Sequence, residues 1–91
     1  MKTVESQVVI GAIWSNRYIN EMVDKLSKKA SSSLYITKDD SRQIAMKSVI
    51  GLLSGNFKEG ETVKITVIGE NEATVNNDLA FAKALLKGEA D

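Results

Sequence analysis

The hydrophobic and polar positions of the chain change period several times, and each period predicts one kind of element. Hydrophobic residues alternate with polar ones near residues 4–10, 34–36, 44–46 and 63–67, which is the period of a strand with one buried face. They recur every three or four positions over residues 19–26 and 75–86, as in an amphipathic helix. We expect a shorter helix from Ser48 to Ser54, capped by Ser48 and stopped by Gly55 and Asn56.

These elements follow one another as βαββαβα. The second and third strands should form a hairpin whose turn is residues 38–41, and Gly88 should end the last helix. Because each helix has one apolar stripe to bury, we expect an α+β fold, a two-layer open-faced sandwich with the helices on one face of a four-stranded antiparallel sheet. A ferredoxin-like sheet would use almost the same elements, but the extra short helix at Ser48 argues against it.

Composition sets limits on partners and chemistry. Ninety-one residues, 43% hydrophobic and 26% charged, predict a single globular domain spanning residues 1–91. Twelve basic residues balance twelve acidic ones, so neither nucleic acid nor a membrane surface is expected as a partner. No apolar run approaches eighteen residues and no signal-peptide core is present, so we expect a cytoplasmic protein.

The chain contains neither cysteine nor histidine. Their absence excludes disulfides, a conventional zinc site and the Ser-His and Cys-His catalytic pairs. We therefore expect no metal, no cofactor and no enzyme. A catalytic role is the least favoured class, because the sequence places no base beside Ser15 or Ser48.

One segment resembles a known family, namely Met46-Lys47-Ser48-Val49-Ile50-Gly51-Leu52-Leu53-Ser54. It is similar to the regulatory-serine segment of HPr, the small phosphocarrier of the bacterial sugar phosphotransferase system. Residues 22–28, 33–36 and 60–69 resemble the family's first helix, second strand and last strand, so the similarity covers nearly the whole chain. It implies an HPr-like sandwich with strand order 1-4-2-3, and a bacterial protein.

The similarity fails at the family's active site. HPr works through a histidine at the head of its first helix, in a His-Ala-Arg-Pro motif, and Ser15-Asn16-Arg17-Tyr18 stands there in this chain. By the resemblance Ser15 takes the place of the histidine and Arg17 matches the arginine. A serine hydroxyl has no neutral nitrogen to accept a phosphoryl group and pass it on. We therefore expect phosphocarrier activity to be lost, as in the histidine-lacking catabolite-repression HPr paralogues.

The start of the first long helix is the first candidate site. Unpaired backbone N–H groups at a helix start attract anions, so Ser15, Asn16 and Arg17 are candidate anion-binding residues. The simpler interpretation makes Ser15 or Asn16 the N-cap and Arg17 a solvated side chain. Trp14 and Tyr18 either cover the end of the core or form an aromatic patch that binds a partner.

The short helix is the second candidate site. In HPr proteins of Gram-positive type the serine that matches Ser48 is phosphorylated by an ATP-dependent HPr kinase, and the modified protein binds a transcriptional regulator of carbon catabolite control. The alternative is an unmodified cap. Val49, Ile50 and Leu53 match the family's docking patch, and two helical turns cannot bury them all, although Leu52 should be buried.

These observations favour an HPr-like regulatory protein without phosphocarrier activity. Its expected partners are proteins, among them an HPr kinase and a transcriptional regulator or another phosphotransferase-system component. The expected partner-binding residues are Trp14, Arg17, Tyr18, Val49, Ile50 and Leu53. The alternative is an unphosphorylated structural or assembly module with an aromatic interface at Trp14 and Tyr18.

Overall fold

The computed structural model of the chain describes residues 1–38 and 42–89. Its elements are β1 (Lys2–Val9), α1 (Asn16–Lys29), β2 (Ser33–Thr37), β3 (Ile44–Ala45), α2 (Val49–Ser54), β4 (Thr62–Gly69) and α3 (Glu72–Lys87). The predicted βαββαβα order is therefore confirmed. Asp39, Asp40 and Ser41 of the predicted hairpin turn lie outside the described residues.

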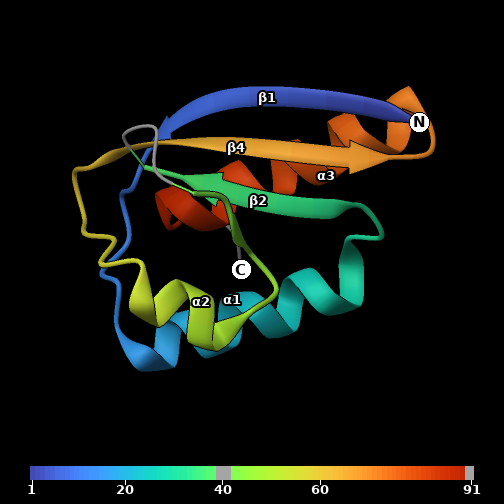
Figure 1. Cartoon of the computed structure of the whole chain (residues 1–91). Helices are drawn as coiled ribbons and strands as arrows, with labels where there is room; N and C mark the ends of the chain where they lie inside the picture. Colours follow the sequence, from blue (N-terminus) through green and yellow to red (C-terminus); the bar gives the residue numbers. More distant parts are fainter. Residues whose placement is uncertain (39–41, 90–91) are drawn as a thin grey trace.

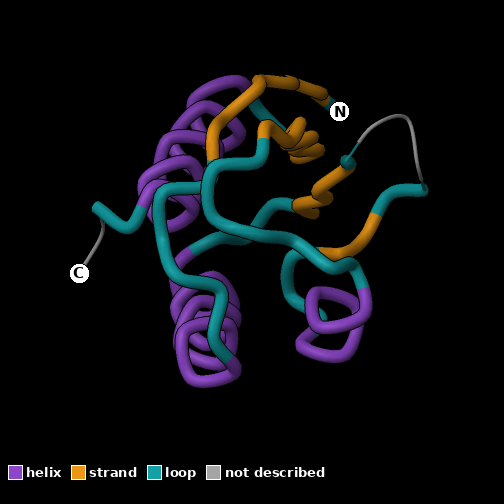
Figure 2. The backbone as a smooth tube through the Cα atoms, turned by 90° about the vertical axis from the view of Figure 1, so that its left-hand side faces the viewer, coloured by secondary structure: helices purple, strands orange, loops and turns teal. Residues whose placement is uncertain are grey.

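The four strands form one antiparallel sheet in the order β1-β4-β2-β3. The three helices lie on one face of this sheet, with α1 and α2 as neighbours below it in Figure 1 and the layers separated in Figure 2. This arrangement confirms the α+β sandwich and the 1-4-2-3 strand order that the family resemblance implied. Exposed polar residues alternate with the buried ones along β1 and β4, among them Glu5, Gln7 and Lys64.

The core lies between the sheet and the helices, as the alternation of the strands predicts. Val8 of β1 pairs with Val63 of β4, and Ile36 of β2 pairs with Ile65 of β4, so their side chains share the helix-facing side. The fully buried helical residues against them include Ile19, Met22, Leu26, Val75, Ala82 and Leu86. Both long helices thus bury the stripe that the sequence marks.

The helix ends agree with the sequence prediction where it named them, and strand β3 is the element whose end differs. Helix α1 begins at Asn16, ahead of its first buried residue Ile19, because Ser15 caps it. Helix α3 likewise begins at Glu72 behind an Asn71 cap, and Gly88 ends it in the left-handed conformation, as predicted. Strand β3 ends at Ala45, although the buried Met46 still donates its N–H to the Leu34 carbonyl at 2.9 Å.

Within the described residues, no helix combines the length and apolar character needed to cross a membrane.

Candidate functional site

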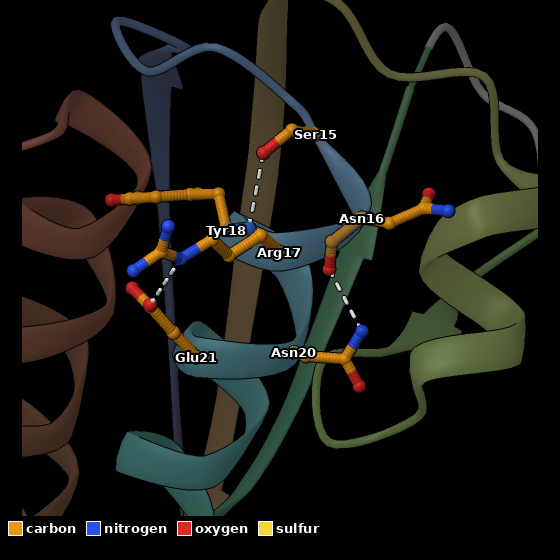
Figure 3. A network of polar contacts seen from close by, with 6 residues as sticks. All are labelled: Ser15, Asn16, Arg17, Tyr18, Asn20 and Glu21. Carbon is orange, nitrogen blue, oxygen red and sulfur yellow. Dashed lines mark hydrogen bonds and ion pairs between the residues drawn. The ribbon is translucent and has the colours of Figure 1, made fainter.

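Ser15 is the N-cap of α1. Its Oγ accepts the backbone N–H of Tyr18 at 3.1 Å (Figure 3). Its carbonyl accepts the N–H of Ile19. Such a cap stabilises a helix by about 1 kcal/mol. Within the described part of the chain, the N–H groups of Asn16 and Arg17 donate no hydrogen bond, so two amides at this end still point to solvent.

Arg17 projects from the first turn of α1 and is 90% exposed. Its Nε lies 3.2 Å from Oε1 of Glu21 one turn later, so the guanidinium runs along the helix (Figure 3). An exposed pair of this kind contributes less than about 1 kcal/mol. An anion at the start of α1 could therefore displace Glu21, but it would have to compete with a carboxylate for Arg17.

Tyr18 joins the start of α1 to the last turn of α3. Its ring is half-buried against the core, and its hydroxyl donates a hydrogen bond to the Leu85 carbonyl. Burial of the phenol, and secondly the charge of Glu21, raise the pKa of Tyr18 above its usual value. The hydroxyl consequently stays neutral and remains a donor at neutral pH.

We expect Tyr18→Phe to lower the free energy of unfolding by about 0.5–1.5 kcal/mol, because the Leu85 carbonyl loses its donor. A thermal melt followed by circular dichroism should show a melting point lower by several degrees. Tyr35→Phe is the matched control, because the structure gives the half-buried Tyr35 hydroxyl no partner among the described residues. Equal melting points for the two variants would contradict a structural role of the Tyr18 hydroxyl.

The same comparison has a defined pH dependence. Since the folded-state pKa of Tyr18 is raised, its contribution is fully present below the ordinary tyrosine pKa and is lost as the pH rises through the folded-state pKa. The difference between wild type and Tyr18→Phe should therefore hold at neutral pH and shrink only in strongly alkaline solution.

Trp14 also packs against the core. Its ring meets Phe57 edge to face, with centroids 5.7 Å apart and planes at 60°. Trp14 and Tyr18 are both half-buried and in contact with the core, as the core-covering interpretation expected.

Ser48 is the N-cap of α2, as predicted. Its Oγ accepts the backbone N–H of Gly51 at 3.0 Å, and the residue is half-buried. A Cβ atom on Gly51 would lie 2.9 Å from Ile44 Cγ2 and 3.2 Å from Ser48 Oγ, so glycine allows this close approach. Ser15 and Ser48 thus have the same structural role at the starts of two neighbouring helices.

Helix α2 leaves part of its apolar surface uncovered. Leu52 is fully buried and Val49 is half-buried, whereas Leu53 is 43% exposed and Ile50 is 81% exposed. The expectation that two turns cannot bury all of these residues is confirmed. Helix α2, which carries Ile50 and Leu53, packs against α1 on the same face of the sheet (Figure 1).

The sequence analysis did not predict the contacts of two residues, Glu21 and Lys47. Glu21 was detectable, because i and i+4 positions of a helix are neighbours and Glu21 stands four residues after Arg17. Lys47 was not, because it donates to the carbonyls of Ala30 at 2.7 Å and Ser32 at 3.1 Å, across the fold. The N–H of Ser32 in turn donates to the buried carboxylate of Asp78 at 3.0 Å.

These contacts form a polar clamp, which we define as Lys47, Ser32 and Asp78. It ties the residue before Ser48 to the carboxyl end of α1 and to α3. The positive ammonium of Lys47 suits the negative end of the α1 dipole. Lys47 is therefore engaged at the end of α1 remote from Ser15.

In the described residues, His, Cys, Asp and Glu form no group of three or more that could hold a metal ion.

Comparison with known proteins identifies the family to which this chain belongs. The family described as "PTS HPr component phosphorylation site" matches residues 15–83, more than half of the chain. The chain belongs to the HPr family of the phosphotransferase system. Proteins of this family are phosphocarriers that interact with other phosphotransferase-system proteins and are not enzymes. A search of curated proteins finds no significant match.

Solved structures share the fold. HPr from Bacillus anthracis is 19% identical with a TM-score of 0.79, over 94% of this chain and 99% of that chain. The Bacillus subtilis catabolite repression protein Crh is 22% identical with a TM-score of 0.72, over 100% and 97%. The protein HPr-C-His from Thermoanaerobacter tengcongensis is 25% identical with a TM-score of 0.67, over 100% of both chains.

Proposed function

We propose that this chain is an HPr-family protein without phosphocarrier activity, which acts as a regulatory or protein-binding module. The exposed apolar surface of α2 carries this proposal, above all Ile50 at 81% exposure. A large apolar side chain that the fold leaves in water beside a second half-covered one commonly marks a protein interface. Leu52 of the same helix is fully buried and supplies the core contact of α2, so the core does not need the Ile50 side chain.

Loss of phosphocarrier activity follows from the side chains at the start of α1. The chain has no histidine, and the proposed replacement Ser15 accepts a capping hydrogen bond from Tyr18. Arg17, the proposed match of the family arginine, is paired with Glu21. Ser15, Asn16 and Arg17 then form an anion-binding end whose affinity is limited by that pair.

The proposed partner site consists of Val49, Ile50 and Leu53 with Arg17 beside them and the exposed edges of Trp14 and Tyr18 at its margin. We propose Ser48, at the head of α2, as the residue through which an HPr kinase would regulate the site. A transcriptional regulator or a phosphotransferase-system component in the cytoplasm would be the bound partner. The alternative of an assembly module centred on Trp14 and Tyr18 has less support, because both rings pack against the core.

The direct test is Ile50→Asp. We expect this change to abolish capture of the partner from an extract of the native cells, because it places a charge in the apolar contact. Far-ultraviolet dichroism and the melting curve should stay nearly unchanged, since the residue is 81% exposed.

Val9→Asp is the control, because Val9 is also a β-branched aliphatic residue and is 52% exposed, but lies in β1, which packs on β4 and α3 and not on α1 or α2. This control should retain partner capture. Loss of folding in Ile50→Asp would show that Ile50 belongs to the core, and equal loss of capture in both variants would show that the site lies elsewhere.

A further inference from the structure

Strand β1 lies at one edge of the sheet, with β4 on one side and no described strand on the other (Figure 1). Just after β1, the N–H of Ile10 donates to the carbonyl of Glu61 at 2.9 Å. Because alternate residues of an antiparallel strand face its neighbour, Ile10 and every second residue before it bond toward β4. The residues between them direct their backbone N–H and C=O groups outward, namely Thr3, Glu5, Gln7 and Val9.

This outer edge is long and has little protection against another strand. Lys2–Val9 pairs with Thr62–Gly69 one residue to one, so no bulge interrupts it, and the chain contains no proline. Within the described residues, none of the outward groups has a backbone partner, and the Gln7 carbonyl meets only the Ser6 hydroxyl at 3.4 Å. Soluble proteins usually cover or interrupt such an edge, because it can pair with a strand of another chain.

The charge on the outward residues is confined to Glu5. Its Oε2 lies 3.7 Å from Nζ of Lys64 and 3.5 Å from Oγ1 of Thr66, both on β4. A carboxylate on an edge strand opposes pairing when a like charge lies directly opposite it. The edge therefore disfavours a strand that sets an acidic residue against Glu5 and accepts one that sets an uncharged amide there.

We propose that β1 pairs antiparallel with β1 of a second copy of this chain, with Ser6 on the two-fold axis, so that one sheet continues across a dimer. This register sets Glu5 opposite Gln7 of the second copy and Thr3 opposite Val9 of the second copy. Each of these pairs exchanges backbone hydrogen bonds, so every outward group of the strand gains a partner. The proposal is independent of α2, because β1 packs on β4 and α3.

The side chains on both faces of the strand suit this register. On the open face, the Gln7 amide of one copy can donate to the Glu5 carboxylate of the other. On the helix side, the half-buried Val4 lies opposite Val8 of the second copy, and the small Ser6 side chains meet at the axis. Pairing therefore removes Val4 from water as well as satisfying the outward backbone groups.

Other registers are less favourable. An axis at Glu5 would set the two Glu5 carboxylates opposite each other, which is destabilising. An axis at Gln7 would set Thr3 opposite Gly11, beyond the end of β1, and lose that pair. An axis between two residues would oppose an outward residue with one that already bonds to β4. The strand thus complements itself about Ser6, which favours a second copy as the occupant of this edge.

Single cysteines can report this register, because the chain contains none of its own. Ser6→Cys would bring two thiols together across the axis, at the Cα separation of about 4.5 Å of a non-hydrogen-bonded pair, which a disulfide can span. Glu5→Cys and Gln7→Cys are the matched controls, because in this register neither lies opposite its own copy. After mild oxidation, a non-reducing gel should show Ser6→Cys cross-linked several times faster than either control.

Sedimentation equilibrium of the chain without added cysteines measures the dimer directly. We expect wild type to pass from monomer to dimer as its concentration rises. Gln7→Pro should raise the dissociation constant at least about tenfold, because proline removes an outward N–H and leaves the bonds to β4 in place. Gln7→Ala keeps that N–H and should have a clearly smaller effect. Circular dichroism would show that both variants are folded.

Ile50→Asp separates this dimer from the proposed docking function of α2. It should dimerise like wild type, and loss of the dimer in this variant would place the contact on α2 and overturn the inference. Equal cross-linking of the three cysteine variants, or a wild-type chain that stays monomeric at millimolar concentration, would also overturn it. A dimer that Gln7→Pro leaves undiminished would have the same consequence, since it would not depend on the outward groups of β1.

Discussion

Incubated with phosphoenolpyruvate and the first enzyme of the phosphotransferase system, the wild-type chain is expected to take up no acid-labile phosphate. The chain offers no histidine nitrogen, and the hydroxyl of Ser15 accepts a capping bond from the Tyr18 N–H. A phosphoserine ester would in any case be a poor phosphoryl donor. Mass spectrometry before and after mild acid treatment would measure the result, with an ordinary HPr in the same tube labelled to completion.

Ser15→His tests whether the missing nitrogen is the cause. We expect this variant to accept phosphate only weakly, because Tyr18 stands where the family has proline and Trp14 alters the approach. The Arg17–Glu21 pair also opposes the incoming phosphoryl group. Acid-labile phosphate on the wild-type chain would contradict the proposed loss of the relay, and labelling of Ser15→His alone would support it.

The fold was predictable because each element buries one face. Val63, Ile65 and Val67 alternate with polar residues, and all three prove to be fully or almost fully buried on the helix side of β4. Periodicity reports such burial within one element, but it says nothing about which strands are neighbours. The strand order therefore came from the family resemblance, and β3 was overestimated because Met46 is buried without belonging to the strand.

The candidate site was predictable only where its determinants are local in the chain. Ser48 was recognised as a cap because capping joins a side chain to an amide three residues later. Tyr18 and Leu85 are 67 residues apart, and no sequence period relates them. The same holds for Lys47, whose contacts with Ala30 and Ser32 depend on how α1, β2 and the start of α2 meet.

The starts of α1 and α2 differ in how firmly contacts with the rest of the fold cover them. At α1 the Tyr18 bond to α3 and the Trp14 contact with Phe57 hold the capping segment against the core. At α2 the clamp holds the backbone at Lys47, but Ile50 and Leu53 stay uncovered. The start of α1 is thus built into the fold, whereas α2 retains an exposed apolar surface, and a change at its cap would act directly beside that surface.

Ser48 is expected to be the residue that an HPr kinase phosphorylates in the presence of ATP, giving a single phosphate by mass spectrometry. Its hydroxyl lies at the head of α2, where a phosphate adding about two negative charges would meet the positive end of a helix. By the resemblance noted in the sequence, Lys47 before it, and the two aliphatic residues and Gly51 after it, correspond to the regulatory-serine segment of HPr.

The variant that tests this site best is Ser48→Asn, because asparagine keeps the capping hydrogen bond of α2 and removes only the phosphate acceptor. It should abolish modification while leaving the melting curve close to that of wild type. Ser54→Ala, which alters another serine of the same helix, should still be modified at Ser48. If the wild-type chain stays unmodified while an ordinary HPr in the same tube is phosphorylated, Ser48 is only a cap. The surface of α2 would then act without a phosphorylation switch.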